Sequence, residues 1–265
     1  MLEAIIFDWA GTLVDHGSRA PLKAFVELFA EQDIEITLAE AREPMGTEKR
    51  LHICRLLQQP RIQQAWITRH GRLPTEAEID TLYQRLVPLQ REQIELHTKL
   101  IPGTLDMLAA VRARGLKIGT TTGYGRAMID NLLIAAAEQG FVPDCVVAAD
   151  EVPATRPAAT AALANLVQLG VSAVQHCVKV DDTAPGISEG RNAGMWTVAV
   201  VLSGNAVGLG ETELQQLSSE ARKNLRNQAY RSLEQTGAHY FIDSVADLPD
   251  VLADIERRLA RNEKP

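Results

Sequence analysis

The sequence predicts an α/β protein with a doubly wound, mostly parallel sheet, a Rossmann-like core and a small inserted α-helical cap. Short apolar runs alternate with helical segments from residue 102 onward, as in parallel βαβ units. The first apolar run is instead followed by a long stretch with helix signals only. A length of 265 residues accommodates a core of about 180 residues and a smaller insert.

Composition restricts the classes of function. The formal net charge is −7, and nucleic-acid binders usually present a basic face, so no nucleic-acid partner is expected. Three cysteines without a CxxC spacing favour reduced, buried thiols over disulfides or a zinc site. The amino-terminal run does not have the form of a signal peptide, and no run reaches the roughly 18 apolar residues of a membrane span. We therefore expect a cytoplasmic protein with no membrane partner.

The first strand is expected at residues 3–8, where the run EAIIFD suggests burial on both faces of a parallel sheet. Only helix signals follow. Prolines and capping threonines mark the predicted helix starts, at Pro21, Thr37, Thr47, Pro60 and Thr75. Pro44 is expected to end one of these helices. We predict that residues 16–99 form the cap domain and that residues 1–15 and 100–265 form the core.

Five further strands, each with a neighbouring helix, are predicted in the core. The strands are expected at residues 116–121, 144–149, 177–181, 196–202 and 239–242. The helices are expected at residues 104–114, 125–139, 157–169, 185–193 and 211–236, followed by a carboxyl-terminal helix. Gly115 suits a left-handed helix end. This alternation predicts one parallel sheet with helices on its faces.

Polar residues follow four of the predicted strands, and the carboxyl ends of strands in an open α/β sheet face a common crevice. Asp8 and Asp182 would hold a hard cation such as Mg²⁺. Thr122 and the backbone from Gly123 onward would donate to phosphate oxygens, and Arg156 would balance charge. Taken singly, each residue has an ordinary alternative as a turn, cap or surface side chain. Their convergence favours a phosphate and metal site.

Four segments, FDWAGT, TTGY, the Arg156 region and VKVDDT, resemble the active-site loops of the haloacid dehalogenase-like superfamily, and the helical block resembles its small cap. Within that superfamily the chain is similar to the phosphonoacetaldehyde hydrolase family over nearly its whole length. The shared segments are IIFDWAGT, PMG followed by Lys49, KIG with TTGY, VPA with RP, and EGRNAGMW. The resemblance implies cleavage of the carbon–phosphorus bond of phosphonoacetaldehyde, with Mg²⁺ as cofactor and a homodimer as the assembly.

Ala10 and Lys49 fit together in such a reaction. In relatives that act on phosphate esters, an aspartate at the position of Ala10 protonates the leaving oxygen. A carbon leaving group needs an electron sink instead, and a lysine amine supplies one by forming a protonated Schiff base with the aldehyde. Lys49 falls in the first turn of a predicted helix, where the positive end of the dipole disfavours an ammonium. Without the resemblance, an ordinary surface lysine is the simpler interpretation.

The resemblance implies roles for further residues. Asp8 would attack phosphorus, and His52 would assist proton transfer around the imine. Met45 would pack beside the lysine, and Tyr124 would line the pocket. Ordinary core packing for Met45 and a hydrogen-bonded helix histidine for His52 are the alternatives. The implied metal ligands are Asp8, the carbonyl oxygen of Ala10 and Asp182.

One position departs from the superfamily pattern. A second acid often stands four residues after the metal-binding aspartate, and here that position is Gly186. Asp181 could substitute through water, but neighbouring strand residues point to opposite faces, so Asp182 is the expected ligand and the role of Asp181 stays open. Two other functions are considered. The missing acid at Ala10 disfavours a phosphomonoesterase or phosphomutase, and the intact site disfavours a non-catalytic phospholigand-binding protein.

Overall fold

The computed structural model describes residues 1–265 and contains one six-stranded sheet in the order β3-β2-β1-β4-β5-β6. The strands are β1 (Ala4–Phe7), β2 (Lys117–Thr121), β3 (Cys145–Val147), β4 (Cys177–Asp181), β5 (Trp196–Val200) and β6 (Tyr240–Ile242). Every pairing is parallel. Strand β1 pairs with β2 on one side and with β4 on the other, so the doubly wound prediction is confirmed. The switch point at which such folds bind ligands lies between β1 and β4.

Strand β1 shows how the sequence fills both faces of the sheet. The core helices are α6 (Thr104–Ala113), α7 (Arg126–Glu138), α8 (Thr160–Gln168), α9 (Ala184–Ala193), α10 (Glu211–Gln215), α11 (Ser219–Glu234) and α12 (Leu248–Ala260), with short 3₁₀ turns at Ala149–Glu151, Val174–His176 and Val245–Asp247. Ile5 and Phe7 pack in the cluster formed with α6, α7 and α12. Ala4 and Ile6 pack in the cluster formed with α8. This alternation explains why the strand is apolar at every position.

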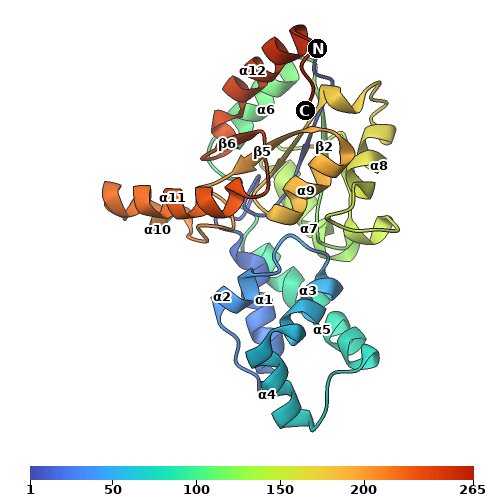
Figure 1. Ribbon diagram of the computed structural model, residues 1–265, viewed down its shortest axis with the longest axis vertical. Coiled ribbons are helices and arrows are strands. Elements are labelled where there is room, and N and C mark those ends of the chain that lie inside the picture. The colour runs from blue at the N-terminus through green and yellow to red at the C-terminus, as the bar shows by residue number, and fades with distance from the viewer.

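Residues 16–99 contain helices and no strand, as predicted. The helices are α1 (Arg19–Ala30), α2 (Leu38–Arg42), α3 (Lys49–Gln58), α4 (Pro60–His70) and α5 (Glu76–Glu95). Eighteen buried hydrophobic residues, all between Leu22 and Leu89, form a separate core there. Figure 1 shows these helices gathered at one end of the molecule, with the sheet and both chain termini toward the other. This helical cap region follows the carboxyl end of β1, so it covers the sheet edge where the switch point lies.

The helix starts test the predictions that were based on capping residues in the sequence. Thr37 and Thr75 form the two predicted capping boxes. The prediction of a cap at Thr47 is wrong. Glu48 caps α3 by accepting from two backbone N–H groups, while the Thr47 hydroxyl donates to the carbonyl of Pro44 at 2.7 Å. The predicted helix 211–236 is two helices, because Ser218 caps a new start. None of the helices combines the length and the hydropathy of a membrane span.

Candidate active site

Three carboxylates meet at the switch point. Asp8 directly follows β1, Asp181 ends β4, and Asp182 follows it. The two strands are paired in register, and the Asp8 N–H donates to the carbonyl of Val180 at 3.0 Å. One oxygen atom of each carboxylate lies within 4.8 Å of the others, and all three residues are buried. This group can hold a metal ion.

Strand alternation does not separate Asp181 from Asp182, because Asp182 lies beyond the strand, in the turn into α9. Both side chains therefore face Asp8. Gly186 makes room for this arrangement. A Cβ atom at Gly186 would lie 1.9 Å from Oδ2 of Asp181. The Asp181 carboxylate thus occupies the volume that a side chain at position 186 would need.

Asp182 is oriented by two donors. The backbone N–H of Asn205 donates to its Oδ2 at 2.6 Å, and the Thr12 hydroxyl donates to Oδ1 at 3.3 Å. Gly11 has φ +87°, and a Cβ there would lie 2.1 Å from Asp182 Oδ2, so the turn after Asp8 needs glycine on both counts. The carbonyl of Ala10 in this turn accepts none of the loop hydrogen bonds. It is therefore free to bind another group.

Arg156 reaches the carboxylates from the loop before α8. Its Nη1 donates to Oδ1 of Asp8 at 2.8 Å and lies 3.3 Å from Oδ2 of Asp181. The other oxygen of Asp8, Oδ2, accepts no hydrogen bond. Asp181 Oδ2 also lies 3.1 Å from Lys179 Nζ, yet it accepts no well-directed hydrogen bond. Asp8 therefore keeps one oxygen for a further group, whereas Oδ2 of Asp181 already lies at ion-pair distance from two cations.

Sequence reasoning missed two members of this charge cluster, Lys179 and Glu189. Both are fully buried, and they form an ion pair with 3.1 Å between Lys179 Nζ and Glu189 Oε2. A signal for Lys179 was present, because a charged residue inside the apolar strand CVKVD must find a buried partner. Glu189 opens the segment EGRNAGMW, which is shared with the family but has no charge or spacing signal of its own. Four carboxylates and two cations leave two negative charges uncompensated, which suits a divalent cation.

The pKa values of the three aspartates depend on their burial and on the charges around them. Burial and the charge of Asp181 raise the pKa of Asp8 to about 6, although Arg156 and Lys179 act in the opposite direction. Burial, together with the charges of Asp8 and Asp181, raises the pKa of Asp182 well above its usual value. Burial also acts to raise the pKa of Asp181, but Arg156 and Lys179 outweigh it, and that pKa is lowered. A cation in this group would favour the ionised form of all three.

Eight of the predicted site residues line one small cavity between the core and the cap region. Its volume is about 20 Å³, which is about the space of one water molecule. The lining comprises the predicted Asp8, Ala10, Met45, Lys49, Thr122, Gly123, Tyr124 and Arg156, together with Ser18, Pro21, Gly46 and Thr183. Asp182 and His52 are absent from it. Asp182 lies beside the cavity with the other carboxylates, and His52 lies behind Lys49 in α3.

Lys49 is the first residue of α3 and is only 3% exposed. Its Nζ makes no hydrogen bond or ion pair in the structure. Instead it lies 4.7 Å from the centre of the Tyr124 ring and 5.7 Å from that of Phe25. Burial lowers the pKa of Lys49 to about 8 against the charges of Asp8 and Glu48, and Arg156 contributes in the same direction as burial. A buried, unpaired amine of this kind is suited to act as a nucleophile.

His52 lies one turn further along α3 and is fully buried. Its ring stacks on Phe25 with 3.8 Å between ring centres. Its Nε2 lies 2.9 Å from the carbonyl of Ala41, which can only accept, so Nε2 carries the proton. Nδ1 has no partner. Burial, and then the charge of Lys49, lower the pKa of His52 well below its usual value, so the ring is neutral.

Two glycines seat the cap region directly on the core. Gly46 has φ +85°, and a Cβ there would lie 2.3 Å from the Thr183 hydroxyl oxygen. A Cβ at Gly123 would lie 2.7 Å from the backbone oxygen of Thr47. Thr122 completes the core side of this contact, where its hydroxyl accepts from the Tyr124 N–H at 3.1 Å. The loop that carries Lys49 therefore touches the core through backbone atoms, and the site is closed.

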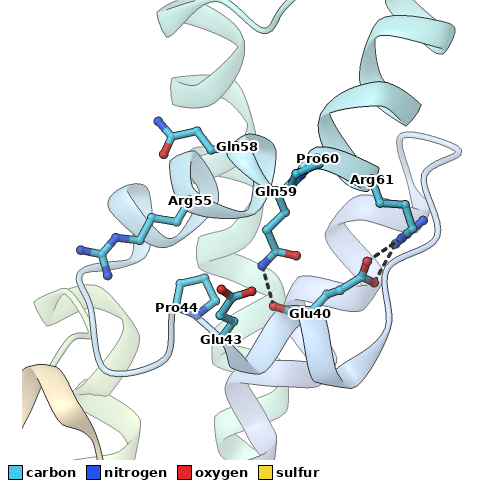
Figure 2. Close-up of a pocket in the computed structure, with 8 residues that line it drawn as sticks. All are labelled: Glu40, Glu43, Pro44, Arg55, Gln58, Gln59, Pro60 and Arg61. Carbon is cyan, nitrogen blue, oxygen red and sulfur yellow. Dashed lines mark hydrogen bonds and ion pairs between the residues drawn. The ribbon is translucent and has the colours of Figure 1, made fainter. Parts of the chain in front are cut away.

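A larger hollow of about 640 Å³ lies on the cap region, outside this site. Figure 2 shows its lining, in which Glu40 accepts from Arg61 while its own carbonyl accepts from Gln59. The lining consists of two prolines, two glutamines and four charged residues, and two of the charged residues, Glu40 and Arg61, are already paired with each other. It holds no buried catalytic group, so the small cavity is the candidate active site despite its size.

The parallel core with an inserted helical cap, and the buried aspartates at its switch point, define a haloacid dehalogenase-like hydrolase. Residues 2–194 match the family described as haloacid dehalogenase-like hydrolase. A β-phosphoglucomutase from Clostridium difficile is 18% identical with a TM-score of 0.72, over 98% of this chain and 100% of that one. At that identity the likeness shows the fold alone.

Closer relatives define the family within this class. A phosphonoacetaldehyde hydrolase from Hahella chejuensis is 51% identical over 100% of this chain and 90% of its own, and one from Bordetella pertussis is 48% identical over 100% and 96%. A crystal structure of a phosphonoacetaldehyde hydrolase-like protein from Oleispira antarctica has a TM-score of 0.99 at 49% identity, covering 100% of this chain and 96% of that one. The chain belongs to the phosphonoacetaldehyde hydrolase family.

Proposed function

We propose that this protein hydrolyses the carbon–phosphorus bond of phosphonoacetaldehyde to acetaldehyde and phosphate. The observation that carries the proposal is the pairing of Lys49 with Ala10 in one cavity opposite Asp8. An unpaired amine faces the place where an aldehyde would sit. No acid stands ready to protonate a leaving oxygen, which is the group a phosphomonoesterase would need.

The chemistry then follows from the residues in order. Neutral Lys49 adds to the aldehyde carbon, water leaves, and a protonated imine forms. A carboxylate oxygen of Asp8 attacks phosphorus, and the electron pair of the carbon–phosphorus bond moves into the imine to give an enamine. The enamine takes a proton on carbon, and water releases acetaldehyde from Lys49. A second water cleaves the aspartyl phosphate and restores Asp8.

Other residues of the site hold charge and protons. Arg156 donates a hydrogen bond to Asp8 and would balance the negative charge of the transferred phosphoryl group. Thr122 and Gly123 line the cavity, where the Thr122 hydroxyl and the Gly123 N–H would donate to phosphoryl oxygens. The free Nδ1 of His52 is an acceptor one helical turn from Lys49, which supports a role in proton transfer around the imine. The Tyr124 ring packs against the Lys49 amine and Met45 lines the same cavity, so both would limit the access of water to the lysine.

The carboxylate group fits a divalent cation, and we propose that it binds Mg²⁺. The proposed ligands are Asp8, Asp182 and the carbonyl oxygen of Ala10, with Asp181 as the neighbouring carboxylate. Bound Mg²⁺ would neutralise the phosphonate oxygens as Asp8 approaches them. The oxygen preference of the site, with no sulfur or imidazole donor in the group, agrees with this metal.

The function is tested by incubating the purified protein with phosphonoacetaldehyde and measuring phosphate and acetaldehyde together. We expect equal amounts of both products with Mg²⁺ and almost none after chelation. A phosphate monoester such as p-nitrophenyl phosphate serves as the comparison substrate. Rapid turnover of the monoester alone would make the protein a phosphomonoesterase. Binding of phosphate without turnover of either compound would make it a non-catalytic binding protein.

We propose that residues 16–99 move as a cap domain against a core formed by residues 1–15 and 100–265. The separate hydrophobic core of the helical region supports this division. A cavity with space for about one water cannot admit the substrate, so the cap must open and close in each turnover.

The family resemblance supports a homodimer as the assembly, and a monomer in light scattering after gel filtration would exclude it.

The glycine at position 123 provides a test of closure. Gly123→Ala places a methyl group against the backbone of Thr47, so it should lower kcat/KM on the order of 10- to 100-fold by holding the lysine loop away from the core. Gly71→Ala is the matched control. A Cβ at Gly71 would meet no other atom, although the backbone there has φ +75°, which favours glycine. The control should lose about 1 kcal/mol in the free energy of unfolding in urea and keep its activity. Full activity of Gly123→Ala would mean that tight closure is unnecessary.

A further inference from the structure

Two buried charges below the cavity have no part in the proposed mechanism. Lys179 is in β4 and Glu189 is in α9, and neither is exposed to solvent. Burying a charge costs free energy unless another group pairs with it. A helix glycine permits the approach, because a Cβ at Gly190 would lie 2.5 Å from the Cβ of Lys179. Their partners indicate what the pair is for.

One carboxylate oxygen gathers most of these partners. Glu189 Oε2 accepts from Arg156 Nε at 3.0 Å and from the Thr121 hydroxyl at 3.0 Å, and lies 3.1 Å from Lys179 Nζ. The Thr121 oxygen in turn accepts from Arg156 Nη2 at 2.7 Å and from Lys179 Nζ at 2.6 Å. Two nitrogens of the guanidinium are thus held from behind. The third, Nη1, is the one that faces Asp8.

The backbone that carries Arg156 is held by the same helix. Arg156 lies outside regular structure, ahead of α8. Asn192, which follows Glu189 by three residues in α9, donates to the carbonyl of Pro157 at 2.8 Å. Helix α9 therefore binds both the side chain of Arg156 and the loop beneath it. Because a guanidinium is planar, fixing two of its nitrogens fixes the direction of the third.

We propose that Glu189 is a positioning residue for phosphoryl transfer. Its carboxylate holds the guanidinium of Arg156 so that Nη1 points at the attacking carboxylate of Asp8, while Lys179 balances its charge. This inference rests on the proposed function, which assigns the transferred phosphoryl group to Asp8 and Arg156. Lys49 and the imine step lie outside the network, because Lys49 Nζ makes no hydrogen bond or ion pair with any of its members and lies against the rings of Tyr124 and Phe25.

The central variant is Glu189→Gln, which keeps the size of the side chain and removes its charge. We expect kcat/KM for phosphate release to fall about 100-fold, as for other displacements of about 1 Å near a reacting group. Trapping of Lys49 by acetaldehyde and borohydride should stay at the wild-type rate, because it needs no phosphoryl transfer. Arg191→Gln, an exposed residue of the same helix, is the matched control and should change neither quantity.

A double-mutant cycle shows whether Glu189 acts through Arg156. In an Arg156→Lys background the guanidinium is gone, so Glu189→Gln should add less than about threefold to the loss. If Glu189→Gln folds poorly, Lys179→Met combined with Glu189→Gln removes one charge of each sign and leaves no new unpaired charge. That variant should show the same loss of phosphate release with normal trapping.

Three outcomes would overturn the inference: wild-type kcat/KM in Glu189→Gln, an equal loss of trapping and phosphate release, or a full further loss in the Arg156→Lys background. The second outcome would indicate a general structural role. Failure of the wild-type protein to release phosphate from phosphonoacetaldehyde is a separate result. It would contradict the proposed function itself, and the unmodified protein is measured first for that reason.

Discussion

Replacing Lys49 with arginine is expected to abolish phosphonoacetaldehyde hydrolysis and leave the protein folded. Arginine stays protonated and cannot form an imine, so kcat should fall on the order of 10⁴-fold or more. Because Lys49 Nζ has no hydrogen-bond or ion-pair partner, the change breaks no polar contact. Phosphate release measures the loss. Reduction with borohydride in the presence of acetaldehyde should add an ethyl group to Lys49 of the wild type and nothing to the variant.

The pH dependence of this trapping reaction provides a second measurement on the same residue. With a pKa of about 8, roughly one lysine in ten is neutral at pH 7, against about one in 3,000 for an ordinary lysine. The trapping rate should therefore rise with pH and level off above about pH 8. A trapping rate that keeps rising to pH 10 would contradict a lowered pKa of Lys49. An active Lys49→Arg protein would contradict the imine route.

Asp8→Asn is expected to separate the two halves of the reaction. The amide cannot serve as the nucleophile, so phosphate release should fall on the order of 10⁴-fold or more. Trapping of Lys49 should persist. The negative charge of Asp8 raises the pKa of Lys49, so its removal should shift the trapping profile to lower pH. The amide oxygen can still accept from Arg156, which keeps the loop in place.

Two measurements decide this case. A stopped assay for phosphate compares the variant with the wild type, and mass spectrometry after borohydride reduction scores the ethylated Lys49. Substantial phosphate release by Asp8→Asn would show that water attacks phosphorus directly. Loss of trapping together with phosphate release would show that Asp8 is needed for the imine step, or for the fold of the site.

The sequence was sufficient for the fold because its signals are local. Apolar runs between helices predicted all six strands, and the strand 177–181 matches β4 at both ends. Side-chain capping at Thr37 and Thr75 is also local. The cap of α3 was assigned to Thr47 instead of Glu48, because a threonine at that place satisfies the pattern while its hydroxyl turns to Pro44.

The candidate site was predictable only in part. The end of each strand placed Asp8, Thr122 and Asp182 at one edge, because the topology of parallel sheets fixes where strand ends meet. Spacing along the chain contains no information about which buried charges pair across elements. The contact of Glu189 with Arg156 joins α9 to a loop 33 positions earlier, and it became visible only when the helix was seen against the sheet.

The place taken by the Asp181 carboxylate affects how sequences of this family should be compared. Because that carboxylate fills the space beside Gly186, an acid at position 181 and a side chain at position 186 exclude each other in this backbone. The residue at position 181 therefore restricts which residue can stand at position 186. Glycine at 186 therefore need not mean one acid fewer at the site, because Asp181 places a carboxylate in the same volume from the end of β4. We expect the two positions to change together among relatives, with an acid at one accompanied by glycine at the other.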